Sequence, residues 1–182
     1  MWTALMLVTA TLVGGAKVAQ APSRPASASD PQEAAREIMV AARYCTLVTV
    51  DQVWGPQARS MDPFAPEADL TVWMATNPKS RKVEQIRFDP RVVLHYLDPK
   101  SQDTVTIYGR ARLITDAGEK KRRWKEEWKV FYPDRDTGYL LIAVTPERVE
   151  LLSPVRGFSN DPVTWRPFTV QMPVRKDEPG SA

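Results

Sequence analysis

The sequence predicts a mainly β protein of the α+β class, an antiparallel barrel with short helices at its ends. Segments rich in β-branched and aromatic residues recur between residues 44 and 152, and short polar turns join most neighbouring segments. Segments with helical periodicity are few and fall between groups of strands. Consecutive hairpins with few crossovers are typical of antiparallel barrels.

The first predicted element is a helix that covers residues 31–42. Asp30 is a favoured N-cap residue, and Pro31 suits the first helical position. Small and apolar residues then recur at helical spacing and predict a buried face formed by Ala34, Ile38 and Ala42.

Alternating or β-branched segments predict strands at residues 44–51, 57–62, 70–76, 91–98, 104–113, 139–145 and 148–152. The first two strands form a hairpin. Gly109 marks a bulge or a close approach within its strand, and Pro146 separates the last two strands. Residues 153–170 are predicted to be irregular.

Two shorter helices are predicted between the strands. One starts after Ser80 and places Val83, Ile86 and Phe88 on one face. The other covers residues 116–128, and its aromatic stripe, which continues to Phe131, is expected in the core. Within it, the basic residues 120–123 lie at i, i+4 spacing from Glu119, Glu126 and Glu127, which is typical of a solvated, ion-paired helix face.

Composition excludes several classes of function. One cysteine and one histidine exclude an intrachain disulfide and any metal site built mainly from Cys and His ligands. The single histidine, His95, lies in a predicted strand, where a structural role is expected. The net charge of +3 becomes +2 when residues 1–21, which contain Lys17, are left out. Such a small excess does not indicate a nucleic-acid partner.

Residues 1–21 have the pattern of a secretory signal peptide. An apolar segment, Met1–Val13, precedes the cleavage motif Ala19-Gln20-Ala21. The apolar segment is too short for a stable membrane span. We therefore expect export to the periplasm or medium, with a cytoplasmic protein as the alternative if the N-terminus is misassigned. Residues 22–30 are predicted as a flexible linker, 31–170 as one domain and 171–182 as a disordered tail.

The segment at residues 71–86 suggests a chemical role. A strand ends at Asn77-Pro78 and a helix begins after Ser80, so backbone N–H groups and the helix dipole favour an anion there. Thr76 and Ser80 add hydroxyl groups, and Lys82, with Arg81 beside it, adds positive charge. The segment is either a phosphate site or a helix cap beside a solvated lysine.

Three short motifs together resemble one family. They are Ala58-Arg59-Ser60-Met61, Trp73-Met74-Ala75-Thr76 and Ser80-Arg81-Lys82. The combination resembles the pyridoxamine 5′-phosphate oxidase-like flavin-binding proteins, and is most similar to the general stress protein branch, over roughly residues 31–152. The resemblance implies an antiparallel split β-barrel with short flanking helices, and a homodimer that binds FMN at the subunit interface.

The resemblance also implies roles for individual residues. Arg59, Thr76, Ser80 and Lys82 would bind the FMN phosphate, with Arg81 nearby. The backbone of Ser60–Met61 and of Met74–Ala75 would follow the isoalloxazine ring. No catalytic residue is implied.

The C-terminal part departs from the family pattern. Vitamin B6 oxidases carry substrate contacts in a C-terminal segment that residues 157–182 do not match. Here Trp165 and Arg166 either reach the partner subunit's flavin or hold a loop in place. We therefore expect a flavin-dependent oxidoreductase acting on a substrate other than vitamin B6. The alternative is a non-catalytic binding or stress-response module that holds flavin, deazaflavin or haem.

Overall fold

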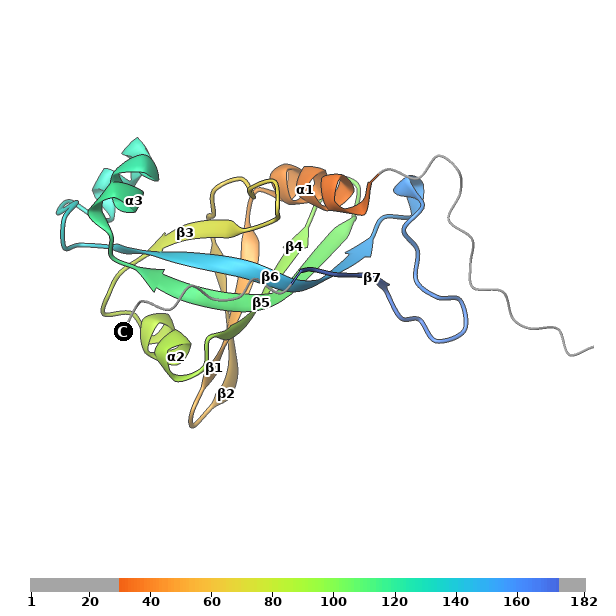
Figure 1. Ribbon diagram of the computed structural model, residues 1–182, viewed down its shortest axis with the longest axis horizontal. Coiled ribbons are helices and arrows are strands. Elements are labelled where there is room, and N and C mark those ends of the chain that lie inside the picture. Colours follow the sequence, from red (N-terminus) through yellow and green to blue (C-terminus); the bar gives the residue numbers. More distant parts are fainter. Residues whose placement is uncertain (1–29, 174–182) are drawn as a thin grey trace, which may run out of the picture.

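The computed structural model, described over residues 30–173, is built on one seven-stranded antiparallel sheet (Figure 1). Along the sheet the strands follow the order β2-β1-β4-β5-β6-β3, and β7 pairs with β6. This architecture confirms the predicted mainly β, antiparallel class. The predicted signal peptide, the linker before residue 30 and the tail beyond residue 173 lie outside the described residues.

The strands are β1 (Cys45–Asp51), β2 (Gly55–Met61), β3 (Val72–Thr76), β4 (Arg91–Leu97), β5 (Thr104–Ile114), β6 (Leu140–Leu152) and β7 (Phe168–Gln171). The helices are α1 (Pro31–Ala42), α2 (Arg81–Phe88) and α3 (Ala117–Arg122), with 3₁₀ turns η1 (Glu126–Val130) and η2 (Pro154–Arg156). None of the helices within residues 30–173 has the length and apolar character needed to cross a membrane.

Helix α1 starts where its sequence predicts. The Asp30 carboxylate accepts hydrogen bonds from the N–H groups of Gln32 (2.9 Å) and Glu33 (3.2 Å), which satisfies two donors of the first turn. The predicted buried face is also confirmed, since Ala34, Ile38 and Ala42 are buried. This face packs against β4 and β5 and closes one end of the main core.

Pro146 does not separate two strands, so this prediction is wrong. Strand β6 runs through it, and Pro146 pairs with Gly109 at a bulge where the β5–β6 register shifts. A bulge tolerates a residue that has no N–H to donate to the ladder. The predicted bulge at Gly109 is confirmed. A side chain there would overlap the Thr145 carbonyl oxygen, so only glycine allows the two strands this approach.

The predicted helix at residues 116–128 is instead two short elements, α3 and η1. Lys125 lies between them, where its ammonium donates to the Pro63 carbonyl (3.0 Å) and pairs with Asp62 (3.2 Å). These tertiary contacts replace one continuous helix. Trp128 is buried as expected, but 72% of Phe131 is exposed, so Phe131 is not a core residue.

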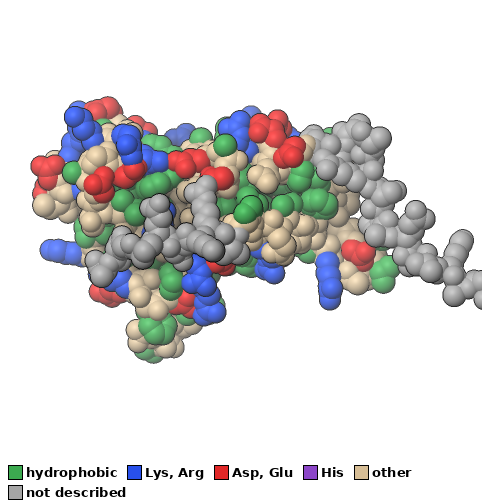
Figure 2. Space-filling view, in the orientation of Figure 1, with side chains coloured by type: hydrophobic (Ala, Val, Ile, Leu, Met, Phe, Trp, Pro, Cys, Tyr) green, Lys and Arg blue, Asp and Glu red, His purple; other side chains and the backbone are tan. Residues whose placement is uncertain are grey.

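The basic run on α3 is largely the ion-paired surface that the sequence predicts. Arg122 and Arg123 both pair with Glu119. On the face shown in Figure 2, positive and negative side chains are interspersed. Lys120 differs, because it is buried against the ring of Tyr139, with its ammonium 4.5 Å from the ring centroid.

Two further expectations need correction. Phe88 is 53% exposed, whereas Val83 and Ile86 of the same helix are buried. Phe88 is the last residue of α2, where the helix has already passed the edge of the core. The segment after Leu152 is also more regular than predicted, since it contains η2 and the strand β7.

The core has two parts that share β6. The larger lies between the sheet and helices α1 and α2. The smaller is aromatic, with Trp73, Trp128 and Tyr139 buried against β6 residues Leu141 and Ala143. The rings of Trp128 and Tyr139 meet edge to face, 6.1 Å apart. This smaller core fixes η1, which lies in the connection between β5 and β6.

Candidate functional site

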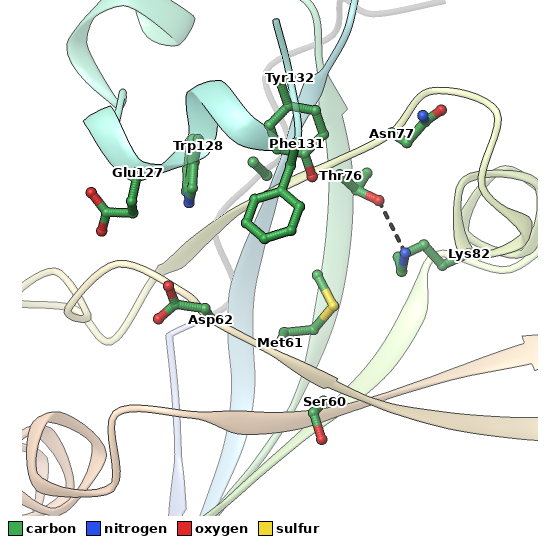
Figure 3. A pocket seen from close by; sticks show the side chains of 11 residues that line it. Ser60, Met61, Asp62, Thr76, Asn77, Lys82, Glu127, Trp128, Phe131 and Tyr132 are labelled. Atoms are coloured by element: carbon green, nitrogen blue, oxygen red, sulfur yellow. Dashed lines mark hydrogen bonds between the residues drawn. The ribbon is translucent and has the colours of Figure 1, made fainter.

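A cleft of about 330 Å³ lies between β2 and β3, the two strands at the ends of the sheet order (Figure 3). Among the described residues, β2 pairs only with β1 and β3 only with β6, so one edge of each strand has no strand partner, although the Trp73 carbonyl of β3 accepts from the Phe64 N–H (2.8 Å). Helix α2 lies at one end of the cleft and η1 at the other. The lining residues are Ser60, Met61, Asp62, Ala75, Thr76, Asn77, Lys82, Glu127, Trp128, Phe131 and Tyr132.

The α2 end of the cleft is polar because β3 runs directly into the helix start. The Thr76 hydroxyl lies 3.1 Å from the Ser80 hydroxyl and accepts a hydrogen bond from the Lys82 ammonium, also at 3.1 Å (Figure 3). Ser80 precedes the first turn of α2, but its side chain makes no cap hydrogen bond. The simple helix-cap interpretation therefore does not describe Ser80.

Arg59 of β2 does not line the cleft, but it lies beside this end, near enough to Lys82 for its charge to act on the lysine. Its guanidinium donates to the Thr49 hydroxyl on β1 (2.5 Å) and to the side-chain oxygen of Gln85 on α2 (2.9 Å). Burial lowers the pKa of Arg59, and the charge of Arg81 lowers it further. Burial also lowers the pKa of Lys82, and the nearby charge of Arg59 lowers it further. Arg59 is thus close enough to both Arg81 and Lys82 for their charges to repel.

Asp51 lies close enough to Arg81 to feel its charge, but within the described part of the chain the two partly buried cations, Arg59 and Lys82, have no carboxylate at ion-pair distance. Across residues 30–173, neither Arg59 nor Lys82 forms an ion pair. Partly buried cations are normally paired, because desolvation without a partner is costly. Two hydroxyl groups and the first turn of a helix lie beside them. Such an arrangement favours an anionic group with several acceptor oxygens.

The structure brings most of the predicted site residues together. Those that line the cleft are Ser60, Met61, Ala75, Thr76 and Lys82, while Ser80 joins them through Thr76. Met74 is completely buried in the main core, so only its backbone is available to the cleft. Arg81 is exposed and contributes through its charge.

Sequence reasoning missed two groups of residues at the site. Gln85 is buried and bonded to Arg59, and its signal was a glutamine between the apolar positions Val83 and Ile86. The second group is an aromatic wall formed by Trp128, Phe131 and Tyr132, of which the first two were assigned to the core and Tyr132 was not singled out. Only the structure shows that it faces the cleft.

The fold and the cleft define a split antiparallel barrel with a positively charged, hydroxyl-lined end of the cleft. The family model described as "Pyridoxamine 5'-phosphate oxidase" matches residues 31–153, and the chain belongs to this family. The suspected membership is thus confirmed. Comparison with curated protein sequences gave no match.

Solved structures share the fold at low sequence identity. One is a protein from Clostridium acetobutylicum related to general stress protein 26, with a TM-score of 0.64, 16% identity and coverage of 77% of this chain and 93% of that chain. General Stress Protein 26 from Bacillus anthracis has a TM-score of 0.62, 20% identity and coverage of 78% and 98%. An FMN-binding protein related to pyridoxamine 5′-phosphate oxidase, from Nostoc punctiforme, has a TM-score of 0.56, 17% identity and coverage of 79% and 93%.

Proposed function

We propose that the protein binds FMN in the cleft, with the phosphate at the α2 end. The observation that carries this proposal is the pair of partly buried cations, Arg59 and Lys82, without carboxylate partners and beside the hydroxyls of Thr76 and Ser80. A phosphate monoester carries a charge of about −1.5 to −2 and three acceptor oxygens. It suits two cations, two hydroxyl groups and the N–H groups of a helix start.

The rest of the cleft fits the flavin ring. Met61 and the wall of Trp128, Phe131 and Tyr132 provide apolar and aromatic surface. The edges of β2 and β3 that have no strand partner would provide backbone N–H and C=O groups for the polar edge of the ring. Bound FMN would supply hydride or electron transfer, while the protein binds and orients it. We therefore propose a flavin-dependent oxidoreductase.

We also propose that the flavin lies at a homodimer interface. The cleft of about 330 Å³ is near the lower limit of typical small-molecule sites, about 300 Å³. Beside it, Val130 and Phe131 are 84% and 72% exposed. A second copy placed over the cleft would cover this apolar surface and enlarge the site. Export, predicted from residues 1–21, remains a proposal.

An absorption spectrum of the desalted protein, recorded before and after incubation with FMN, tests the proposal. Retained flavin bands, bleached by NADH or NADPH and restored by an electron acceptor over repeated cycles, would support a flavin-dependent oxidoreductase. Retained flavin without turnover would favour the non-catalytic module. A protein that takes up no FMN, but binds haem or deazaflavin, would refute the assignment of FMN.

A further inference from the structure

We propose that Gln85 is a positioning residue that keeps the charge of Arg59 free for a phosphate, and thereby makes the site prefer phosphorylated over unphosphorylated flavin. The inference rests on the proposed FMN-binding function and deepens it. It depends on a hydrogen-bond network among four residues from three elements: Thr49 and Asp51 of β1, Arg59 of β2 and Gln85 of α2.

Both ends of the Gln85 amide are used in this network. Its oxygen accepts from the Arg59 guanidinium (2.9 Å) and from the Thr49 hydroxyl (2.5 Å). Its nitrogen donates to the Asp51 carboxylate (2.9 Å). Gln85 is only 4% exposed and Thr49 is completely buried, so water does not compete for these bonds. The amide is therefore held in one place.

The chemistry of the partners also fixes the amide orientation. The guanidinium of Arg59 can only donate, so it must face the amide oxygen. The carboxylate of Asp51, when ionised, can only accept, so it must face the amide nitrogen. The hydrogen bond from Gln85 lowers the pKa of Asp51 more than any other contact does. This bond helps to keep the Asp51 carboxylate ionised. Turning the amide over would break both contacts.

In this orientation Gln85 separates a carboxylate from a guanidinium. Asp51 Oδ2 is bound to Gln85, and Asp51 Oδ1 accepts from the N–H groups of Val53 (3.0 Å) and Trp54 (3.1 Å). Asp51 is therefore held by other donors instead of pairing with Arg59. Arg59 is oriented by three neutral oxygens, those of the Thr49 hydroxyl, the Gln85 amide and the Leu47 carbonyl (3.4 Å), and these leave its positive charge uncompensated.

A glutamate at position 85 would have nearly the same shape but would cancel this charge. It would form an ion pair with Arg59 and would lose the donor that holds Asp51. The phosphate is the part of FMN that riboflavin lacks. The ratio of the two dissociation constants therefore isolates the contribution of the Arg59 end of the cleft from that of the flavin ring.

The experiment is a titration of the full-length protein with FMN and with riboflavin, followed by flavin fluorescence. We expect Gln85→Glu to weaken FMN binding at least about tenfold, as for loss of a charge-assisted contact, and to leave riboflavin binding nearly unchanged. Gln85→Met, which removes all three side-chain hydrogen bonds without adding charge, should reduce the FMN preference by a smaller factor. Gln102→Glu, in an exposed turn, makes the same change in net charge and should have no effect.

The outcomes separate this inference from the proposed function. If the wild-type protein prefers FMN and a folded Gln85→Glu variant prefers it equally, the role of Gln85 is refuted but the proposed function is not. If Gln85→Glu does not fold, a Gln85→Met variant with the wild-type preference refutes it equally. A wild-type protein that binds neither flavin refutes the proposed function, and the inference with it.

Discussion

Replacement of Lys82 by methionine tests the anion site most directly. Methionine retains much of the length of the side chain and removes its charge. In the ligand-free protein the Lys82 ammonium is partly buried and is repelled by Arg59, and within residues 30–173 its one hydrogen-bond partner is the Thr76 hydroxyl at 3.1 Å. We therefore expect that Lys82→Met does not destabilise the ligand-free fold, although it removes a hydrogen bond.

The expected effect on binding is much larger. A charge-assisted hydrogen bond contributes about 1.5–3 kcal/mol, so the dissociation constant for FMN should rise roughly 10- to 150-fold. Riboflavin, which has no phosphate, should bind the variant and the wild type equally. Replacement of Arg59 by alanine should weaken FMN binding by a similar factor, about 1.5–3 kcal/mol, for the same reason.

The pH dependence of stability provides an independent signature of Lys82. Its pKa is lowered by burial and then by Arg59, so just below the ordinary lysine pKa the unfolded chain binds more protons than the folded one. The free energy of unfolding therefore contains a contribution from Lys82 that increases as pH rises from the lowered pKa of the folded protein to the ordinary lysine pKa. Lys82→Met should abolish this contribution.

Fluorescence titration and thermal unfolding measure these effects, with Lys79→Met as the matched control. Lys79 is exposed, three residues away, and bonds through its backbone rather than its ammonium. An FMN affinity in Lys82→Met equal to that of Lys79→Met would refute the phosphate assignment. Parallel losses of FMN and riboflavin affinity would show instead that the substitution disturbs the cleft as a whole.

Substitutions at three further positions test the fold. Gly109→Ala should destabilise the protein by about 1–3 kcal/mol in a denaturant titration, since the new methyl group overlaps the Thr145 carbonyl, and an unchanged midpoint would contradict the bulge geometry. Burial raises the pKa of the Cys45 thiol to about 11 from 9.0, so the thiol's contribution to the free energy of unfolding should fall as pH rises between these values. Cys45→Ala should flatten this pH dependence. Rapid reaction of native Cys45 with a thiol reagent near neutral pH would contradict its burial. Asp30→Ala should lower the free energy of unfolding by about 1 kcal/mol, and Asp30→Asn should lower it much less, because asparagine also caps helices well. Equal losses of stability in the two variants would argue against an N-cap role of Asp30 in α1.

Features set by neighbouring residues were the predictable part of this molecule. Alternating strands, the Asp30 cap and the grouping of Thr76, Ser80 and Lys82 all depend on short stretches of chain. The three side chains span seven consecutive residues, and a strand that turns into a helix brings them together. Their geometry follows from local rules of backbone structure.

Features that depend on distant partners were not predictable from pattern alone. Pro146 remains within a strand because Gly109, far away in sequence, forms the bulge opposite it. Gln85 is explained only by its contacts with β1 and β2. Phe131 has the helical spacing of a core residue, but tertiary bonds of Lys125 end the helix and leave its ring over the cleft. Patterns in a single sequence do not reveal which distant residues will be in contact, so these three features could not be predicted.

The position of η1 within the β5–β6 connection affects how such a protein can diversify. The proposed phosphate end is formed by β2, β3 and α2, whereas the aromatic wall comes from residues 115–139. The two strands that flank these residues are already paired at Ile114 and Leu141, so the length of the connection is not fixed by the barrel register. Insertions or replacements there would reshape the mouth of the cleft without moving Thr76, Ser80 or Lys82. Inherited variation in this connection would thus alter which molecules reach the proposed flavin while the residues proposed to hold its phosphate stay in place.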